Sequence, residues 1–293
     1  MRLGPAARAA MRSRVRDLLP ALRVLGFAGA VAILVFMAAR AAGDVDLRAV
    51  AWWPLPLAFA GAAAWWLLGA RGWSILVTGR SNRRDMSMWC RTQALRYLPG
   101  GIWAPASRAV AISGGLVDRL STVTTDNVVA LCAALAIGAS AFAAKGDYRW
   151  LAVVAVVGAP YLAARALAGK TRVDSIRTLR ATGNYLAAFA AYSLAAVLVQ
   201  AAVSGLDDPL AVAGAAAIGW SVGFLVVIAP SGAGVRELVY VELLSSTLPT
   251  AEATAAALTM RVLATLAELA VLLLVAAPAL PRRRQVEEEA ANR

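Results

Sequence analysis

Long apolar runs alternate with short charged stretches along the whole chain. Seven runs approach or exceed the roughly 20 residues that a bilayer-spanning helix needs, so they predict membrane helices. These runs are Val24 to Ala39, Val50 to Ala70, Ser121 to Ala144, Trp150 to Ala168, Asn184 to Ser204, Pro209 to Ala229 and Ala251 to Leu280. The pattern predicts an all-α polytopic membrane protein in which residues 1–293 form a single membrane domain.

The first run follows a basic stretch, as the core of a secretory signal does. The sequence after it, AARAAGDVDLR, is a weak match to a cleavage site, and many apolar runs follow. We therefore expect a retained first helix, preceded by a basic cytoplasmic segment at residues 1–23. Residues 282–293 are expected to form a charged tail.

The charges between the runs predict the orientation, because cytoplasmic loops retain lysine and arginine. Arginines gather before the first run, in residues 71–91 and in residues 170–180, whereas residues 207–208 are acidic. This places the N-terminus in the cytoplasm. Seven crossings would leave the three arginines 282–284 outside, so residues 234–248 are expected to belong to an eighth crossing. The last helix is expected to begin at Thr250, which follows a proline.

The amino-acid composition limits the classes of function that this chain can have. Sixty per cent of the 293 residues are hydrophobic, above the 45–50% typical of soluble domains. The net charge of +12 comes from arginines confined to loops, which indicates membrane orientation rather than nucleic-acid binding. The absence of histidine excludes Ser-His-Asp and Cys-His catalysis and the usual zinc sites. We expect no enzymatic activity, no cofactor and no metal.

The stretch YLPGGIWAPASR interrupts the apolar pattern. Pro99, Gly100 and Gly101 disfavour a continuous helix, and the flanking segments are too short and polar to cross a bilayer alone. A re-entrant pair of short helices is expected, because irregular backbone within a membrane survives only inside protein or beside an aqueous cavity. The alternative is a surface turn whose aromatic residues lie among the lipid headgroups.

The stretch IAPSGAGVRE is a second break of the same kind, with Pro230, Gly232 and Gly234 before Arg236 and Glu237. Paired helix breaks in the two halves of a membrane protein indicate a transporter site, and an inverted repeat is one hypothesis for them. Amides around Gly232 and Gly234, with the Arg236 guanidinium, suit a phosphate. The alternative places Arg236 at the membrane surface and pairs Glu237 with a neighbour.

Charged residues within the runs are a further indication. Glu268 follows Arg261 by seven residues, so both lie on one face of a helix, and Asp126 lies early in the third run. Such groups are costly in lipid and indicate an interior pairing or a transport pathway; a structural salt bridge is the alternative. The expected substrate-binding cavity is lined by Arg96, Arg108, Arg236 and Arg261. Asp126, Glu237 and Glu268 would hold these arginines and offer contacts to a cationic headgroup moiety.

Two patterns favour packing over chemistry. The tryptophan pairs Trp52–Trp53 and Trp65–Trp66 are expected to form aromatic belts at the two ends of the second run. The stretch AVAGAAAIGWSVG is rich in small residues, which permit close helix contacts.

The motifs RYLPGGIW at residues 96–103, with Arg108 and SGGL after it, and APSGAGVRE at residues 229–237, with Arg261 after it, carry a resemblance to a family. The chain resembles the lysylphosphatidylglycerol synthase transmembrane-region family, the membrane half of the bacterial multiple peptide resistance factor. This resemblance implies a polytopic domain of the bacterial cytoplasmic membrane that moves lipids between leaflets. Asp126 stands where family members commonly show a glutamate. Little chain follows the last run, so we expect a stand-alone form without the synthase domain.

The leading hypothesis is a lipid translocase that binds an anionic or aminoacylated phospholipid, or a polyprenyl-linked lipid, by its headgroup. The alternative is a membrane scaffold that recruits a separately encoded lipid- or envelope-modifying enzyme through the basic loop at residues 71–91. An intramembrane enzyme is disfavoured, because the sequence offers no paired acid and nucleophile.

Overall fold

The computed structural model describes residues 50–97, 102–153, 174–226 and 229–276, together with the single positions 39 and 162. Within these residues all regular structure is helical, as the apolar pattern predicts. The predicted first run, most of the fourth run and the tail at 282–293 lie outside the described residues. The total of seven to eight crossings therefore stays a prediction.

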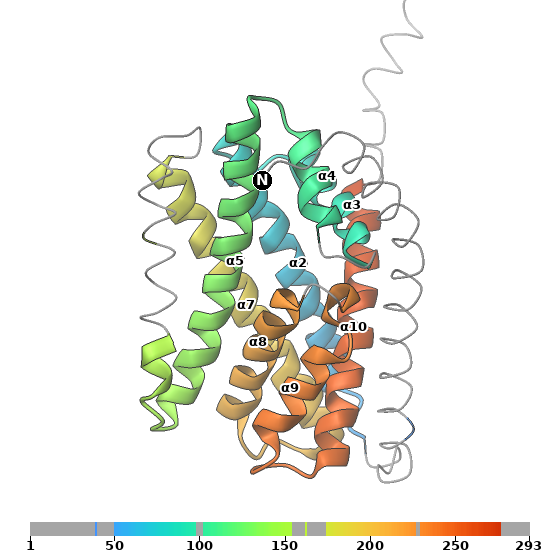
Figure 1. Cartoon of the computed structure of the whole chain (residues 1–293). Coiled ribbons are helices and arrows are strands. Elements are labelled where there is room, and N and C mark those ends of the chain that lie inside the picture. The colour runs from blue at the N-terminus through green and yellow to red at the C-terminus, as the bar shows by residue number, and fades with distance from the viewer. Residues whose placement is uncertain are drawn as a thin grey trace, which may run out of the picture.

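Four long helices form the body of the molecule (Figure 1). They are α2 (Pro54–Thr78), α5 (Leu116–Ala144), α7 (Ser175–Ser204) and α10 (Thr250–Ala276). Among the described helices, α5, α7 and α10 are long and apolar enough to cross a membrane, whereas α2, at 25 residues, has the length but not the hydropathy. The chain is thus compatible with an integral membrane protein. The start of α10 at Thr250 confirms the predicted boundary.

One end of the bundle is basic. Here the first residue of α3, Arg83, donates to the last carbonyls of α10, with 3.2 Å to Val275 O and 2.9 Å to Leu274 O. Arg177 near the start of α7 donates to Val77 O at the end of α2, over 3.4 Å. The charged residues that the structure describes at this basic end are Arg80, Arg83, Arg84, Arg119, Arg177 and Arg180, against Asp85, Asp118 and Asp174.

The opposite end is acidic. The amide of Ala51, just before α2, donates to Ala202 O near the end of α7 over 2.8 Å, and Lys145 after α5 pairs with Asp208 before α8. Partial burial raises the pKa of Asp208, but the hydrogen bonds and charge supplied by Lys145 and the Ala211 amide outweigh it, so the net pKa is lowered. Described charges at this acidic end are Asp147, Asp207, Asp208 and Glu252, against Lys145 and Arg149.

Two helical hairpins enter the bundle from opposite ends (Figure 1), and three of their four helices are half-length, whereas α8 has 17 residues. The first hairpin comprises α3 (Arg83–Gln93), the 3₁₀ turn η1 (Ala94–Tyr97) and α4 (Trp103–Ala111); the second comprises α8 (Pro209–Leu225), η2 (Pro230–Gly232) and α9 (Val235–Leu244). Helices α3, α4 and α9 have 11, 9 and 10 residues, or about 14–17 Å each, roughly half of a bilayer core. Turns η1 and η2 contact each other, so the two tips meet in the interior.

The second hairpin sets the direction in which α10 runs. Residues 234–248 contain only α9, whose 10 residues extend about 15 Å and lead back to the acidic end. Because α8 and α9 together enter and leave at one end, α10 begins at the acidic end and finishes at the basic end beside Arg83. Its exit therefore lies with the other arginines.

Small residues bring the second hairpin into close contact with its neighbours, which confirms their predicted packing role. A Cβ atom on Gly219 of α8 would lie 2.9 Å from the backbone oxygen of Arg236 in α9. A Cβ on Gly214 would lie 2.7 Å from the Phe142 ring of α5. Such contacts are shorter than van der Waals distance, so only glycine permits this helix spacing.

We expect Gly219→Ala to destabilise the protein by about 1–3 kcal/mol, the usual cost of overpacking. The obstructing atom belongs to backbone and cannot turn aside. The matched control is Gly183→Ala in α7, where no atom lies within 4 Å of an added Cβ and helix propensity favours alanine by up to about 1 kcal/mol. Thermal unfolding in detergent measures both, and equal melting temperatures for the two variants would contradict the packing argument.

Candidate functional site

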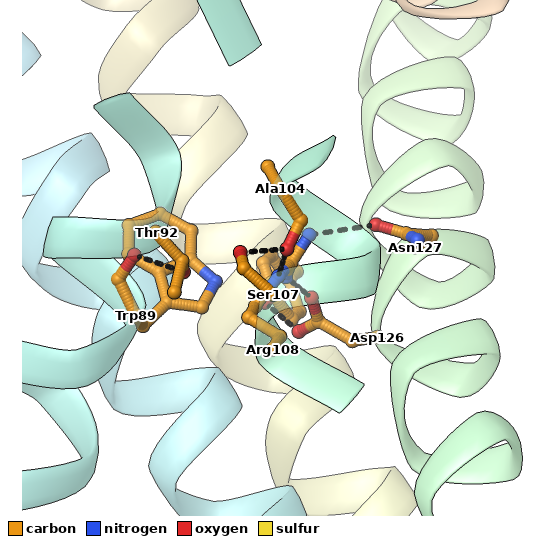
Figure 2. Close-up of polar contacts among 8 residues, drawn as sticks. Trp89, Thr92, Ala104, Ser107, Arg108, Asp126 and Asn127 are labelled. Atoms are coloured by element: carbon orange, nitrogen blue, oxygen red, sulfur yellow. Dashed lines mark hydrogen bonds and ion pairs between the residues drawn. The ribbon is translucent and has the colours of Figure 1, made fainter. Parts of the chain in front are cut away.

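The first ion pair of the site joins α4 to α5. Figure 2 shows Arg108 of α4 directed at Asp126 and Asn127 of α5; the guanidinium pairs with the Asp126 carboxylate, and Nη2 donates to Asn127 Oδ1 over 3.3 Å. The hydroxyl of Tyr185 on α7 donates to the other carboxylate oxygen. The Arg108 guanidinium also lies 5.3 Å from the Trp73 ring. Arg108 and Asp126 are almost fully buried.

The second ion pair joins the tip of the first hairpin to α10. Arg96 Nη2 lies 2.6 Å from Glu268 Oε2, and the Tyr97 hydroxyl donates to the same oxygen over 2.5 Å. The guanidinium stacks on Trp66 at 4.5 Å. Glu268 is buried and accepts two hydrogen bonds at one oxygen.

The third ion pair joins the second hairpin to α10. Arg261 Nη1 lies 3.0 Å from Glu237 Oε1, and Glu237 Oε2 accepts the Gly234 amide over 2.7 Å. This carboxylate therefore caps the start of α9. As predicted, Arg261 and Glu268 share one face of α10, and each is bonded to a different hairpin.

Arg236 differs from the other three arginines. Within the described residues it forms no ion pair, its Nε is buried without a hydrogen-bond partner, and its guanidinium lies 5.4 Å from the Trp220 ring. Two glycines leave room for it: a Cβ on Gly223 would lie 2.3 Å from Arg236 Cγ, and one on Gly232 would lie 2.8 Å from Nε. The side chain thus occupies a slot between α8 and η2.

A cavity of about 400 Å³ lies between the two hairpin tips, within the size range of small-molecule sites. Aromatic rings contribute much of its lining, namely those of Trp65, Trp66, Trp89, Tyr185, Phe189, Trp220 and Phe224. Ile102 and Leu225, one from each hairpin, also line it and expose 61% and 58% of their surface. The cavity therefore combines an aromatic interior with an apolar, exposed edge.

A second cavity of about 40 Å³ lies beyond the first. Trp65 and three polar residues, Arg96, Ser231 and Arg236, line both cavities. Ser231 has a φ of 54°, the one left-handed non-glycine conformation among the described residues, and strained backbone of this kind gathers at functional sites. Arg96, Ser231 and Arg236 lie at the boundary between the two cavities.

The structure brings most of the predicted site residues together. Arg96, Arg108, Asp126, Gly232 and Arg236 line the larger cavity, and Arg236, Glu237 and Arg261 line the smaller one. Three others stand just behind: Glu268 under Arg96, Gly234 at the start of α9, and Pro230 in η2. Pro99, Gly100 and Gly101 lie outside the described residues.

The predicted phosphate nest is not available in this structure. The amide of Gly232 donates to Ala229 O over 2.9 Å, and that of Ala233 donates to Pro230 O over 3.0 Å. The Gly234 amide is taken by Glu237. The tight 3₁₀ turn and the carboxylate cap use all three donors internally, so Arg236 remains as the group able to receive an anion.

The belt prediction is wrong for one tryptophan pair. Trp52 and Trp53 are exposed, as a belt requires, but Trp65 and Trp66 are only 7% and 2% exposed and belong to the core. They pack against other rings, with Trp65 4.8 Å from Tyr192 between ring centroids. Spacing along the run could not distinguish these positions, because both pairs lie near its ends.

Tyr97, Tyr185 and Ser231 are site residues that the sequence analysis missed. Tyr185 lies in the alanine-rich stretch NYLAAFAAYSL, and its position in an apolar run could have indicated a buried hydroxyl that needs a hydrogen-bond partner. No sequence pattern marks the left-handed conformation of Ser231.

No protein-family model matches the chain, and no curated protein is similar to it. The described residues also contain no group of three or more Cys, Asp or Glu side chains placed to hold a metal ion.

Proposed function

We propose that the chain is a lipid translocase of the bacterial cytoplasmic membrane, of the lysylphosphatidylglycerol synthase transmembrane-region type that its two Pro-Gly motifs resemble. The headgroup enters the larger cavity while the acyl chains stay in the bilayer. The observation that carries the proposal is Arg236, a guanidinium without an anionic partner in the described residues, facing a cavity between two hairpin tips.

The edge of the cavity suits a lipid. An exposed apolar edge makes favourable contacts with acyl chains but not with a water-soluble solute. Ile102 and Leu225 provide this edge where the hairpins meet. The aromatic lining accommodates the glycerol backbone, and the guanidinium pairs with the phosphate.

The proposed orientation places the basic end in the cytoplasm. The two hairpins are then re-entrant from opposite faces, which supports an inverted arrangement of the two halves. With the helices predicted outside the described residues, the complete chain has seven to eight membrane segments and a cytoplasmic N-terminus.

Scrambling of acyl-labelled phosphatidylglycerol in proteoliposomes tests the function. We expect the native chain to accelerate movement between leaflets and Arg236→Ala to slow it by about tenfold or more, since a hydrogen-bonded charge contributes about 1.5–3 kcal/mol. Arg149→Ala is the matched control, because Arg149 lies at the exposed acidic end, where it pairs with Asp147.

Two results would count against translocation. Equal rates in empty and protein-containing vesicles would remove the transport function. Lipid binding without movement, together with an enzyme that co-purifies and is lost on neutralising residues 71–91, would favour the scaffold hypothesis.

A further inference from the structure

The charge balance of the site extends the proposed function to the class of headgroup. Four guanidiniums, Arg96, Arg108, Arg236 and Arg261, face three carboxylates, Asp126, Glu237 and Glu268. Four positive and three negative groups leave a net charge of +1 within the described residues. The excess resides on Arg236, since the other three arginines are paired.

Each of the three carboxylates is already neutralised by one arginine. Asp126 accepts from Arg108 and Tyr185, Glu237 accepts from Arg261 and the Gly234 amide, and Glu268 accepts from Arg96 and Tyr97. A cationic headgroup would have to displace an arginine from one of them. The displaced guanidinium would then be left without a counter-charge in a weakly polar site, which is unfavourable.

The neutral polar groups of the larger cavity do not change this balance. Gln93 and Asn127 line it, and Asn127 Oδ1 already accepts from Arg108. An amide supplies hydrogen bonds to glycerol hydroxyls but cannot neutralise an ammonium group. The cavity therefore offers one positive charge, aromatic surface and hydroxyl-binding groups.

We infer that this site selects lipids whose headgroup carries a single net negative charge, a phosphodiester with an uncharged polar substituent, and that it rejects aminoacylated, net-cationic headgroups. One phosphodiester neutralises the excess charge of the site. A zwitterionic headgroup brings one ammonium group that finds no unpaired carboxylate, and the lysyl ester of phosphatidylglycerol brings two. The structure thus disfavours the aminoacylated cargo that the family resemblance implies.

This inference rests on the proposed translocase function. Two measurements distinguish a failure of the headgroup selectivity from a failure of the translocase function. The first compares scrambling of acyl-labelled phosphatidylglycerol, phosphatidylcholine and lysylphosphatidylglycerol, which share a phosphate and differ in net charge. We expect phosphatidylglycerol to move at least about tenfold faster than the other two, equivalent to about 1.4 kcal/mol. The variant Arg236→Gln should lose this preference, whereas Arg149→Ala should keep it.

The second measurement is the shift in melting temperature of the detergent-solubilised chain with short-chain forms of the same three lipids. A shift in melting temperature for phosphatidylglycerol alone, absent in Arg236→Gln, supports the proposed headgroup selectivity. If this shift is seen but no lipid moves, the translocase function is wrong and the headgroup selectivity stands. Equal shifts and equal scrambling for all three lipids, or preference for the lysyl ester, overturns the inference and leaves translocation intact.

Discussion

Replacing Asp126 by alanine should lower the free energy of unfolding by about 3–5 kcal/mol, the largest stability effect expected of any substitution in the site. The change leaves the Arg108 guanidinium buried without a counter-charge and removes the acceptor of the Tyr185 hydroxyl. Arg108 and Tyr185 are each only 3% exposed, so each would keep an unpaired polar group in a buried position. Thermal unfolding in detergent gives the shift.

A combined variant tests the electrostatic explanation. Arg108→Met with Asp126→Leu and Tyr185→Phe removes both charges and the hydroxyl that bonds the carboxylate, and it should recover most of the lost stability, because apolar side chains can replace a buried ion pair. The exposed pair Asp147–Arg149 is the control, and Asp147→Ala should leave the melting temperature unchanged. A stable Asp126→Ala protein would mean that the network has no structural role.

Replacing Gly223 by alanine should slow lipid movement about tenfold to a hundredfold without unfolding the protein. The added Cβ would lie 2.3 Å from Arg236 Cγ and 3.0 Å from Nε, so the arginine must leave its slot. The nearest obstructing atom, Cγ, moves only if the Arg236 side chain rotates about its first torsion angle, which carries the guanidinium out of the slot. The expected loss corresponds to a charged hydrogen bond of about 1.5–3 kcal/mol.

The double variant Gly223→Ala with Arg236→Ala gives the decisive comparison. If alanine at position 223 acts by displacing Arg236, the double variant should be no slower than Arg236→Ala alone, because neighbours in one mechanism are not additive. Gly183→Ala, which meets no atom within 4 Å, should keep the native rate. Additive losses would show that Gly223 acts through packing instead.

The sequence was sufficient to find the charged residues of the site. Arg96, Arg108, Asp126, Arg261 and Glu268 stand out because ionisable groups in apolar surroundings are costly and need partners. Their positions did not reveal which arginine pairs with which carboxylate. Arg261 and Glu268 share a helix face, yet each pairs with a hairpin distant in sequence.

The parts of the fold that escaped prediction depend on tertiary contacts. Residues 209–229 are apolar enough to suggest a full crossing, but α8 ends at Leu225 and the chain turns back at η2. The left-handed conformations of Ser231 and Gly232 make this reversal, and only the glycine of the two marks it in the sequence. Likewise, Trp65 is buried against aromatic rings of α7 and α8, and Trp66 packs against Trp89 of α3.

Helix α10 links the two halves mechanically. It carries Arg261 for the second hairpin and Glu268 for the first, and seven residues of helix fix these points about 10 Å apart along its axis. An α-helix resists stretching, so neither hairpin can follow the other without breaking its own ion pair. Movement of one hairpin away from α10 therefore breaks one of the two ion pairs and leaves the other in place.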